Sequence, residues 1–145
     1  MKKEKFSVMI NAPKEKVWDT LWNDQSYREW TSVFYPGSHA VSDWNEGSKI
    51  QFLGPDGHGM YSRIDRKQPN EYMAFKHLGE VKDGKEQEAN ESTESWAGAM
   101  ETYSLRKSED GTELEVELDV TDDHQQYFKE TFPQALNKVK ALAES

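Results

Sequence analysis

The stretch TELEVELDVTDDHQQYFKETFPQALNKVKALA, residues 112–143, holds the two patterns that decide the fold. In its first part, Leu114, Val116, Leu118 and Val120 alternate with acidic residues, the period of a strand with one buried face. In its second part, apolar residues recur at helical spacing: Phe128, Phe132, Ala135, Leu136, Val139, Leu142 and Ala143. The stretch predicts a half-buried strand and a long C-terminal helix. Pro133 cannot donate a backbone hydrogen bond, so we expect the helix to kink or restart there.

Upstream of this stretch the chain has the pattern of short strands separated by turns rich in Gly, Pro, Asn and Asp. The predicted strands are residues 39–44, 48–53, 59–67, 71–78, 96–107 and 112–120. Near the start, Phe6, Val8 and Ile10 alternate as a first strand, Val17 to Trp22 has helical spacing, and Tyr27 to Trp30 suggests a second short helix. The sequence predicts one α+β domain over residues 1–145, in the order β-α-α-β-β-β-β-β-β-α, with a curved antiparallel sheet of about seven strands around the terminal helix.

The segment from Glu80 to Ser95 is the most polar part of the chain. It is acidic, contains Gly84, and has Val81 and Ala89 as its apolar residues. We interpret it as a long mobile loop between two strands, since such connections are usually polar and solvated. The alternative is a lid over the mouth of a cavity.

Composition excludes several classes of function. The net charge of −9 and the pI near 4.9 oppose nonspecific binding to phosphate backbones or to anionic membranes. The chain has no cysteine, which excludes disulfides, thiolate catalysis and cysteine-based zinc sites. The basic start, Met1 to Lys5, leads into strand-like alternation, and no apolar run approaches membrane-spanning length. We therefore expect a soluble cytoplasmic protein that neither binds nucleic acid nor inserts into membranes.

Local sequence motifs then point to a known family. The segment Ile10-Asn11-Ala12-Pro13-Lys14-Glu15-Lys16-Val17-Trp18, followed by Leu21 and by Tyr27-Arg28-Glu29-Trp30, resembles the opening of proteins related to the activator of the heat-shock-protein-90 ATPase. Later matches are Glu46 to Ile50, Gly59-Met60-Tyr61 and Gly111 to Leu114. The resemblance implies the helix-grip fold of the START-like (SRPBCC) superfamily and a habit of binding hydrophobic ligands in the hollow under the helix. It implies no particular reaction.

Aromatic residues are the candidate wall of that hollow, because large flat side chains bound cavities well and Trp and Tyr add a polar handle. The alternative is that they pack only against one another. The predicted ligand-binding residues are Trp22, Trp30, Phe52, Tyr61, Phe75, His77, Tyr103 and Phe132. His77 shares a strand face with Met73 and Phe75, so it can be a ligand contact or general base, or simply a strand-end histidine. Arg63 is a further candidate for a polar contact inside, or a surface residue.

Motifs for other chemistry are missing, so we predict no catalytic residue, metal or cofactor. His39, His58, His77 and His124 are far apart and form no i, i+4 pair of the kind used by helical zinc sites. The segment Gly54 to Gly59 is glycine-rich, but the Lys-Ser/Thr pair of a phosphate-binding loop does not follow it. We therefore predict a hairpin turn there. No serine sits in a Gly-x-Ser-x-Gly elbow, so nothing supports a Ser–His–acid triad.

Three functions remain open on the sequence. The leading one is noncatalytic binding of a small hydrophobic molecule: a lipid, an aromatic metabolite or a polyketide-like compound. The second is a protein-interaction module like the chaperone activators, which an exposed apolar patch would favour. The third is an enzyme of cyclase or hydrolase type with His77 or a cavity carboxylate as base.

Overall fold

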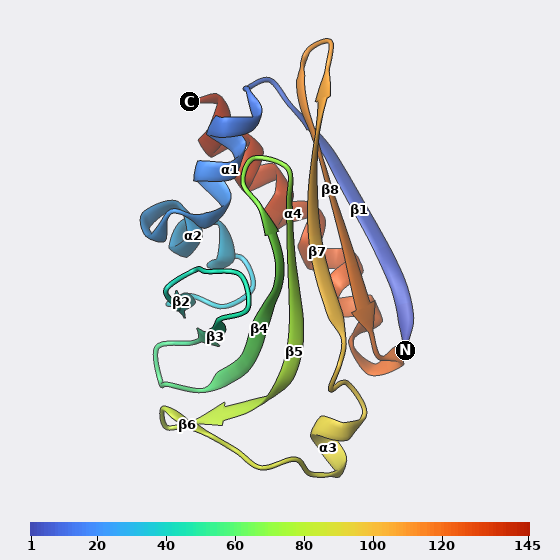
Figure 1. The fold of residues 1–145 in the computed structure, drawn as a ribbon. Coiled ribbons are helices and arrows are strands. Elements are labelled where there is room, and N and C mark those ends of the chain that lie inside the picture. The colour runs from blue at the N-terminus through green and yellow to red at the C-terminus, as the bar shows by residue number, and fades with distance from the viewer.

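The computed structural model describes residues 1–145 and contains eight strands and four helices (Figure 1). In chain order the elements are β1 (Lys2–Ile10), α1 (Lys14–Trp22), α2 (Asp24–Thr31), β2 (His39–Val41), β3 (Lys49–Leu53), β4 (Gly59–Gln68), β5 (Tyr72–Lys82), β6 (Lys85–Glu86), α3 (Glu91–Glu94), β7 (Met100–Ser108), β8 (Gly111–Val120) and α4 (Asp122–Glu144). The predicted α+β helix-grip fold is confirmed.

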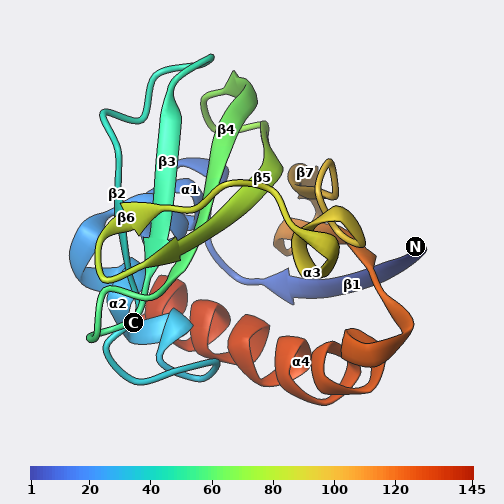
Figure 2. The same cartoon turned by 90° about the horizontal axis from the view of Figure 1, so that it is seen from below.

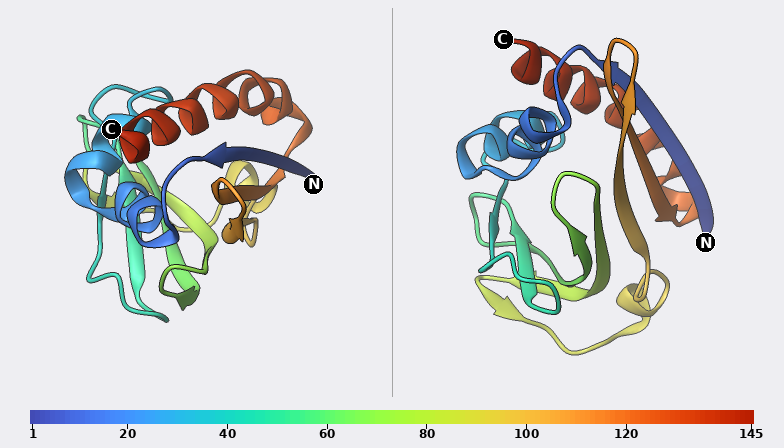
Figure 3. Two further views of the ribbon diagram at one scale, coloured as in Figure 1. Left: turned by 90° about the horizontal axis from the view of Figure 1, so that it is seen from above. Right: turned by 45° about the horizontal axis from the view of Figure 1, so that its top comes forward.

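The strands form one antiparallel sheet in the order β1-β8-β7-β5-β4-β3-β2, with β6 paired to β5. The sheet curves, and α4 runs along one side of it, with α1 and α2 near the C-terminal end of the helix (Figure 2; Figure 3, left). Helix α4 packs against β1, α1 and α2. The sheet therefore arches around a space that α4 and α2 close from the other side.

The two patterns of residues 112–143 build the core as predicted. Leu114, Val116, Leu118 and Val120 of β8 are buried, as are Phe132, Ala135, Leu136, Val139 and Ala143 of α4. They belong to a hydrophobic cluster of 22 buried residues. Burying one such side chain contributes about 1.5–3 kcal/mol, so this alternation is enough to fix which face of β8 points inward.

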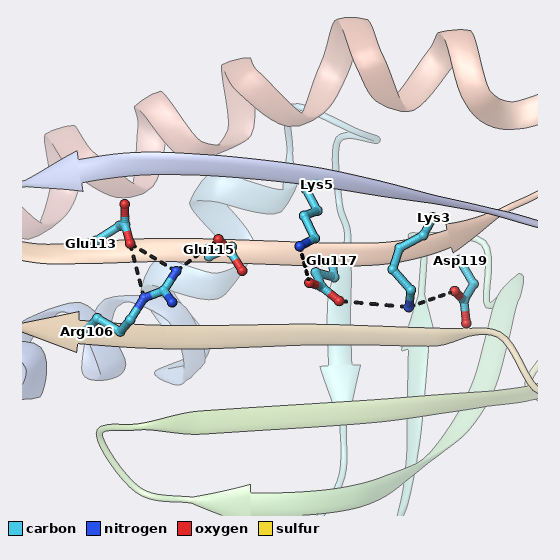
Figure 4. A network of polar contacts seen from close by, with 7 residues as sticks. All are labelled: Lys3, Lys5, Arg106, Glu113, Glu115, Glu117 and Asp119. Atoms are coloured by element: carbon cyan, nitrogen blue, oxygen red, sulfur yellow. Dashed lines mark hydrogen bonds and ion pairs between the residues drawn. The ribbon is translucent and has the colours of Figure 1, made fainter.

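The opposite face of β8 carries acidic side chains that pair with basic residues of the neighbouring strands (Figure 4). The Arg106 guanidinium lies 3.0 Å from Glu113 and 2.9 Å from Glu115, and Lys5 Nζ lies 3.2 Å from Glu117. Exposed pairs of this kind contribute about 0–1 kcal/mol each. Their main consequence is to keep this face polar, which leaves the inner face for the core.

The C-terminal helix does not restart at its proline. Helix α4 includes Pro133 and runs unbroken from Asp122 to Glu144. Phe132 and Ala135 are buried on either side of the proline, and this packing outweighs the lost backbone bond. The Gln134 side chain also donates to the Glu130 carbonyl at 3.1 Å, which adds a hydrogen bond within the turn that holds the proline.

The segment 80–95 is not a plain loop. Strand β5 continues to Lys82, a turn at Asp83 and Gly84 with positive φ at both residues leads into β6, and Asn90 caps α3. Asp-Gly is a strong signal for such a two-residue hairpin turn. None of the four helices combines the length and apolar character needed to span a bilayer.

Candidate functional site

A cavity of about 700 Å³ lies between the inner face of the sheet, α2 and the N-terminal half of α4. It is lined by 29 residues, of which 15 are hydrophobic. Pockets of about 300–1,000 Å³ hold molecules of drug size. The cavity is thus large enough for an organic ligand, and its wall is mixed rather than purely apolar.

The apolar part of the wall is mainly aromatic. Phe34 and Phe132 pack edge to face with their ring centroids 4.9 Å apart, and Phe128 lies 6.0 Å from Phe132. Phe52 closes the opposite side from β3, and Trp96 lines the cavity just after α3. These rings come from four separate regions of the chain, so they meet only because the sheet wraps around α4.

The polar part of the wall is a connected row of side chains. His77 Nε2 lies 3.1 Å from Glu101 Oε1, and His77 Nδ1 lies 2.7 Å from the Ser62 hydroxyl. The Tyr103 hydroxyl donates to the second oxygen of Glu101. Because a carboxylate only accepts, the imidazole carries its proton on Nε2 when neutral, and Ser62 then donates to Nδ1. Each oxygen of Glu101 is therefore held by one protein donor.

Ser62, His77 and Glu101 are the residue types of a catalytic triad. However, the acid rather than the serine faces the cavity. Ser62 is fully buried and is not part of the cavity wall, whereas His77 and Glu101 both line it. In a triad the serine faces the substrate and the acid lies behind the histidine. Here Ser62 fixes the orientation of the ring, and the carboxylate faces the space. The arrangement suits recognition of a ligand by Glu101 rather than nucleophilic attack by Ser62.

A β-bulge brings a second acid to the cavity. The pairing of β4 with β5 shifts between Tyr61 and Ser62, so that Ser62 is opposite His77 but Met60 is opposite Glu80. The extra residue, Leu78, changes which side chains of β5 face inward, as bulges do beside many functional sites. Glu80 and Met60 both line the cavity as a result.

Two tyrosines beside Glu101 are buried, and burial raises the pKa of Tyr27 and of Tyr103 above the ordinary value. The negative charge of Glu101 raises both pKa values further. Their hydroxyls therefore stay protonated far into the alkaline range. Tyr103 remains a donor to Glu101, and Tyr27 lines the cavity next to it.

These raised pKa values predict alkaline unfolding. The contribution of each tyrosine to stability is intact below about pH 10, the unfolded value, and falls by about 1.4 kcal/mol per pH unit above it. In a pH jump, we expect tyrosinate absorbance equivalent to two tyrosines to appear only as the circular dichroism of the sheet is lost. The variants Tyr27→Phe and Tyr103→Phe should each remove half of that delayed signal. Immediate ionisation of all six tyrosines with an intact sheet would contradict the burial argument.

Four of the predicted ligand-binding residues line the cavity, and four do not. Those on the wall are Phe52, His77, Tyr103 and Phe132. Trp30 and Phe75 are fully enclosed in the core, where the Trp30 indole N–H donates to the Leu21 carbonyl. Trp22 lines a separate hollow of about 220 Å³ with Trp18 and Trp44.

Tyr61 and Arg63 lie on the outer face of β4. The Tyr61 ring covers Gly79 and stands 5.6 Å from Lys49 Nζ, while Arg63 pairs with Asp65 at 3.1 Å. Their placement follows from pairing: Phe52 is opposite Met60, so the next residue of β4 must face outward. The role of the four wall residues in binding stays a prediction.

Glu101 and Glu80 were not predicted because, apart from His77, the predicted wall consists of aromatic residues. Tyr27 was predicted only as part of the second short helix. For Glu101 a signal existed, since it is two residues before Tyr103 and alternation places both on one face. For Glu80 the signal is weak, because an unbroken alternation from His77 would turn it outward.

A curved antiparallel sheet around a long terminal helix, with a cavity between them, defines the helix-grip architecture of the START-like superfamily. The chain belongs to the family described as "Activator of Hsp90 ATPase homolog 1-like protein", whose model matches residues 11–144. This confirms both the superfamily and the branch that the opening segment resembles.

Solved structures show the same fold. The Aha1 dimer from Colwellia psychrerythraea is similar with a TM-score of 0.76 and 20% sequence identity, over 99% of this chain and 97% of that chain. A protein from Mesorhizobium loti is similar with a TM-score of 0.75 and 17% identity, over 97% and 96% of the two chains. DynU16, from the dynemicin biosynthetic locus, has a TM-score of 0.70 and 12% identity, over 99% of this chain and 47% of its own. No curated protein sequence matches the chain.

Proposed function

We propose that this chain binds a small, largely apolar molecule in the cavity and that it does not transform it. The observation that carries the proposal is a cavity of about 700 Å³ whose aromatic wall is interrupted by one ordered polar cluster, His77–Glu101–Tyr103. A well-formed apolar pocket with a few convergent polar groups is the usual form of a small-molecule site.

Burial of the ligand's apolar surface would drive binding. Each 100 Å² of apolar ligand surface removed from water contributes about 2.5 kcal/mol, before the losses of association are subtracted. Glu101, held on both oxygens, would orient the polar end of the ligand without having to reorganise. Release would require movement of α4 or of the segment 80–95, from which Glu80 and Ser92 contribute to the wall.

A cavity-filling variant tests this proposal. Met60 lines the cavity on β4, so Met60→Trp should fill part of it and weaken binding of the neutral probe naphthylethanol by at least about tenfold. Met9 is 45% exposed on β1, outside the cavity, and Met9→Trp is the matched control that should leave affinity unchanged. Calorimetric titration measures both. Equal affinity of the two variants would place the probe elsewhere and contradict the proposal.

Native mass spectrometry of the protein purified from its own host would then identify the natural ligand. A small molecule that is lost on denaturation, and that the Met60→Trp variant fails to retain, is the expected result. Organic extraction of the complex would name its chemical class.

A second candidate is a protein-interaction role, as the family's description points to the chaperone Hsp90. Met9 and Val41, which are 45% and 52% exposed, lie on β1 and β2, the two edge strands of the sheet. Exposed apolar edges are surfaces to which partners add. If this role holds, the chain should stimulate the ATPase of Hsp90, and Met9→Lys or Val41→Lys should reduce the stimulation. An unchanged ATPase rate would contradict it.

A further inference from the structure

The cavity wall carries carboxylates but no lysine or arginine. The chain has 18 Lys and Arg residues, and none of them is among the 29 residues that line the cavity. The acidic residues on the wall are Asp56, Glu80, Glu101 and Asp119. All four histidines of the chain also line it, and the net charge of −9 counts them as neutral at pH 7: His39, His58, His77 and His124. Asp119 is neutralised from outside, because one oxygen pairs with Lys3 at 3.2 Å and the other accepts the Met100 N–H. With the histidines neutral, Asp56, Glu80 and Glu101 give the space a negative potential.

Glu101 is built to accept a further hydrogen bond. A carboxylate offers about four lone-pair sites, and His77 and Tyr103 occupy one on each oxygen. The side chain is 23% exposed, and this exposed part faces the cavity that Glu101 lines. Since both protein partners are donors, the carboxylate keeps its role as an acceptor and has capacity left for a donor from the ligand.

Aromatic residues lie beside this carboxylate, and one of them, Tyr103, donates its hydroxyl to it. Tyr27 and Tyr103 lie close enough for its charge to raise the pKa of both, and Phe52 packs against the His77 ring at 6.1 Å. The faces of aromatic rings attract cations within about 6 Å. An acid placed among aromatic residues favours a positively charged nitrogen and disfavours a carboxylate or phosphate.

We infer that the cavity selects an amphipathic amine, in which an apolar and preferably aromatic body fills the wall of rings and a protonated nitrogen pairs with Glu101. This inference rests on the proposed binding function and narrows it. Fatty acids and other anionic lipids are thereby disfavoured, since their carboxylate would lie against Glu101 or Glu80 with no lysine or arginine on the wall to pair with it.

Three probes with one ring system test the inference: naphthylethylamine, naphthylethanol and naphthylpropanoic acid, titrated calorimetrically at pH 7. The amine should bind at least about tenfold more tightly than the acid, with the alcohol between them. Glu101→Gln, which keeps the shape of the side chain, should weaken the amine about tenfold or more and change the alcohol by less than about threefold.

The net charge of −9 would attract any amine weakly, so a variant with the same change of charge is the control. Glu115→Gln lies on the outer face of β8, where Glu115 pairs with Arg106 at 2.9 Å (Figure 4), and should leave the amine affinity unchanged. Equal loss in both variants would assign the preference to overall charge and overturn the inference. If the alcohol binds and the acid binds as tightly as the amine, the cavity function stands and the amine inference falls. If none of the probes binds, both the proposed binding function and the amine inference are contradicted.

Discussion

Replacing Phe75 with alanine is expected to lower the free energy of unfolding by about 3–5 kcal/mol, the range measured when buried phenylalanines are truncated. Phe75 is completely buried and packs edge to face against Phe52 and Trp22, with ring centroids 5.2 and 5.4 Å away. Its removal leaves a void among rings that cannot collapse, because Trp22 and Phe52 are held from different elements. For a chain of this size the melting temperature should fall by about 10 °C or more.

Phe52 is the matched control. It is also a phenylalanine of the sheet, in β3, which β4 separates from β5, but it is only partly buried and lines the cavity. We expect Phe52→Ala to cost about 1–2 kcal/mol of stability and to weaken naphthylethanol binding more than Phe75→Ala does. Denaturant unfolding followed by titration of the folded variants measures both quantities. If the two variants lose equal stability, Phe75 is part of the cavity wall rather than of the core beneath it.

This pair of residues also illustrates how far sequence analysis reaches. The fold could be predicted because the hydrophobic residues of β8 and α4 recur at clear strand and helix periods, and because the opening segment carries a family-specific sequence motif. Both Phe52 and Phe75 could be predicted to point inward, since they follow the alternation of their strands. How deeply each of the two rings is buried could not be predicted, because burial depends on which strands and helices pack over the ring.

The register between strands is the second property that could not be predicted from the sequence. Tyr61 and Phe52 were both predicted to line the hollow, yet Phe52 is opposite Met60, so Tyr61 must face outward. The bulge at Leu78 likewise turns Glu80 inward, against the simple alternation from His77. A shift of one residue exchanges the two faces of a strand. Sequence periodicity alone therefore finds the strands but not the full membership of the site.

Gly111 is predicted to be hard to replace, because it combines a positive φ with a close approach of backbone atoms. It begins β8 with φ of +139°, and a Cβ atom there would lie 2.1 Å from the Ile10 carbonyl oxygen. This contact sits where the corner between β1 and α1 crosses the β7–β8 hairpin, and the Thr112 hydroxyl donates to the Ala12 carbonyl at 2.8 Å in the same place. An added methyl group would have to push the backbone of β1 away from β8.

We expect Gly111→Ala to destabilise the protein by about 3 kcal/mol or more, since backbone strain and overpacking each cost about 1–3 kcal/mol. Gly47→Ala separates the two causes. Gly47 also has a positive φ, of +86°, but an added Cβ would meet nothing within 4 Å, so strain alone should cost about 1 kcal/mol. Urea unfolding of both variants gives the comparison. A loss at Gly111 no greater than that at Gly47 would mean that the β1–α1 corner yields easily, and that the close approach of β1 to the β7–β8 hairpin is not what holds this end of the sheet around α4.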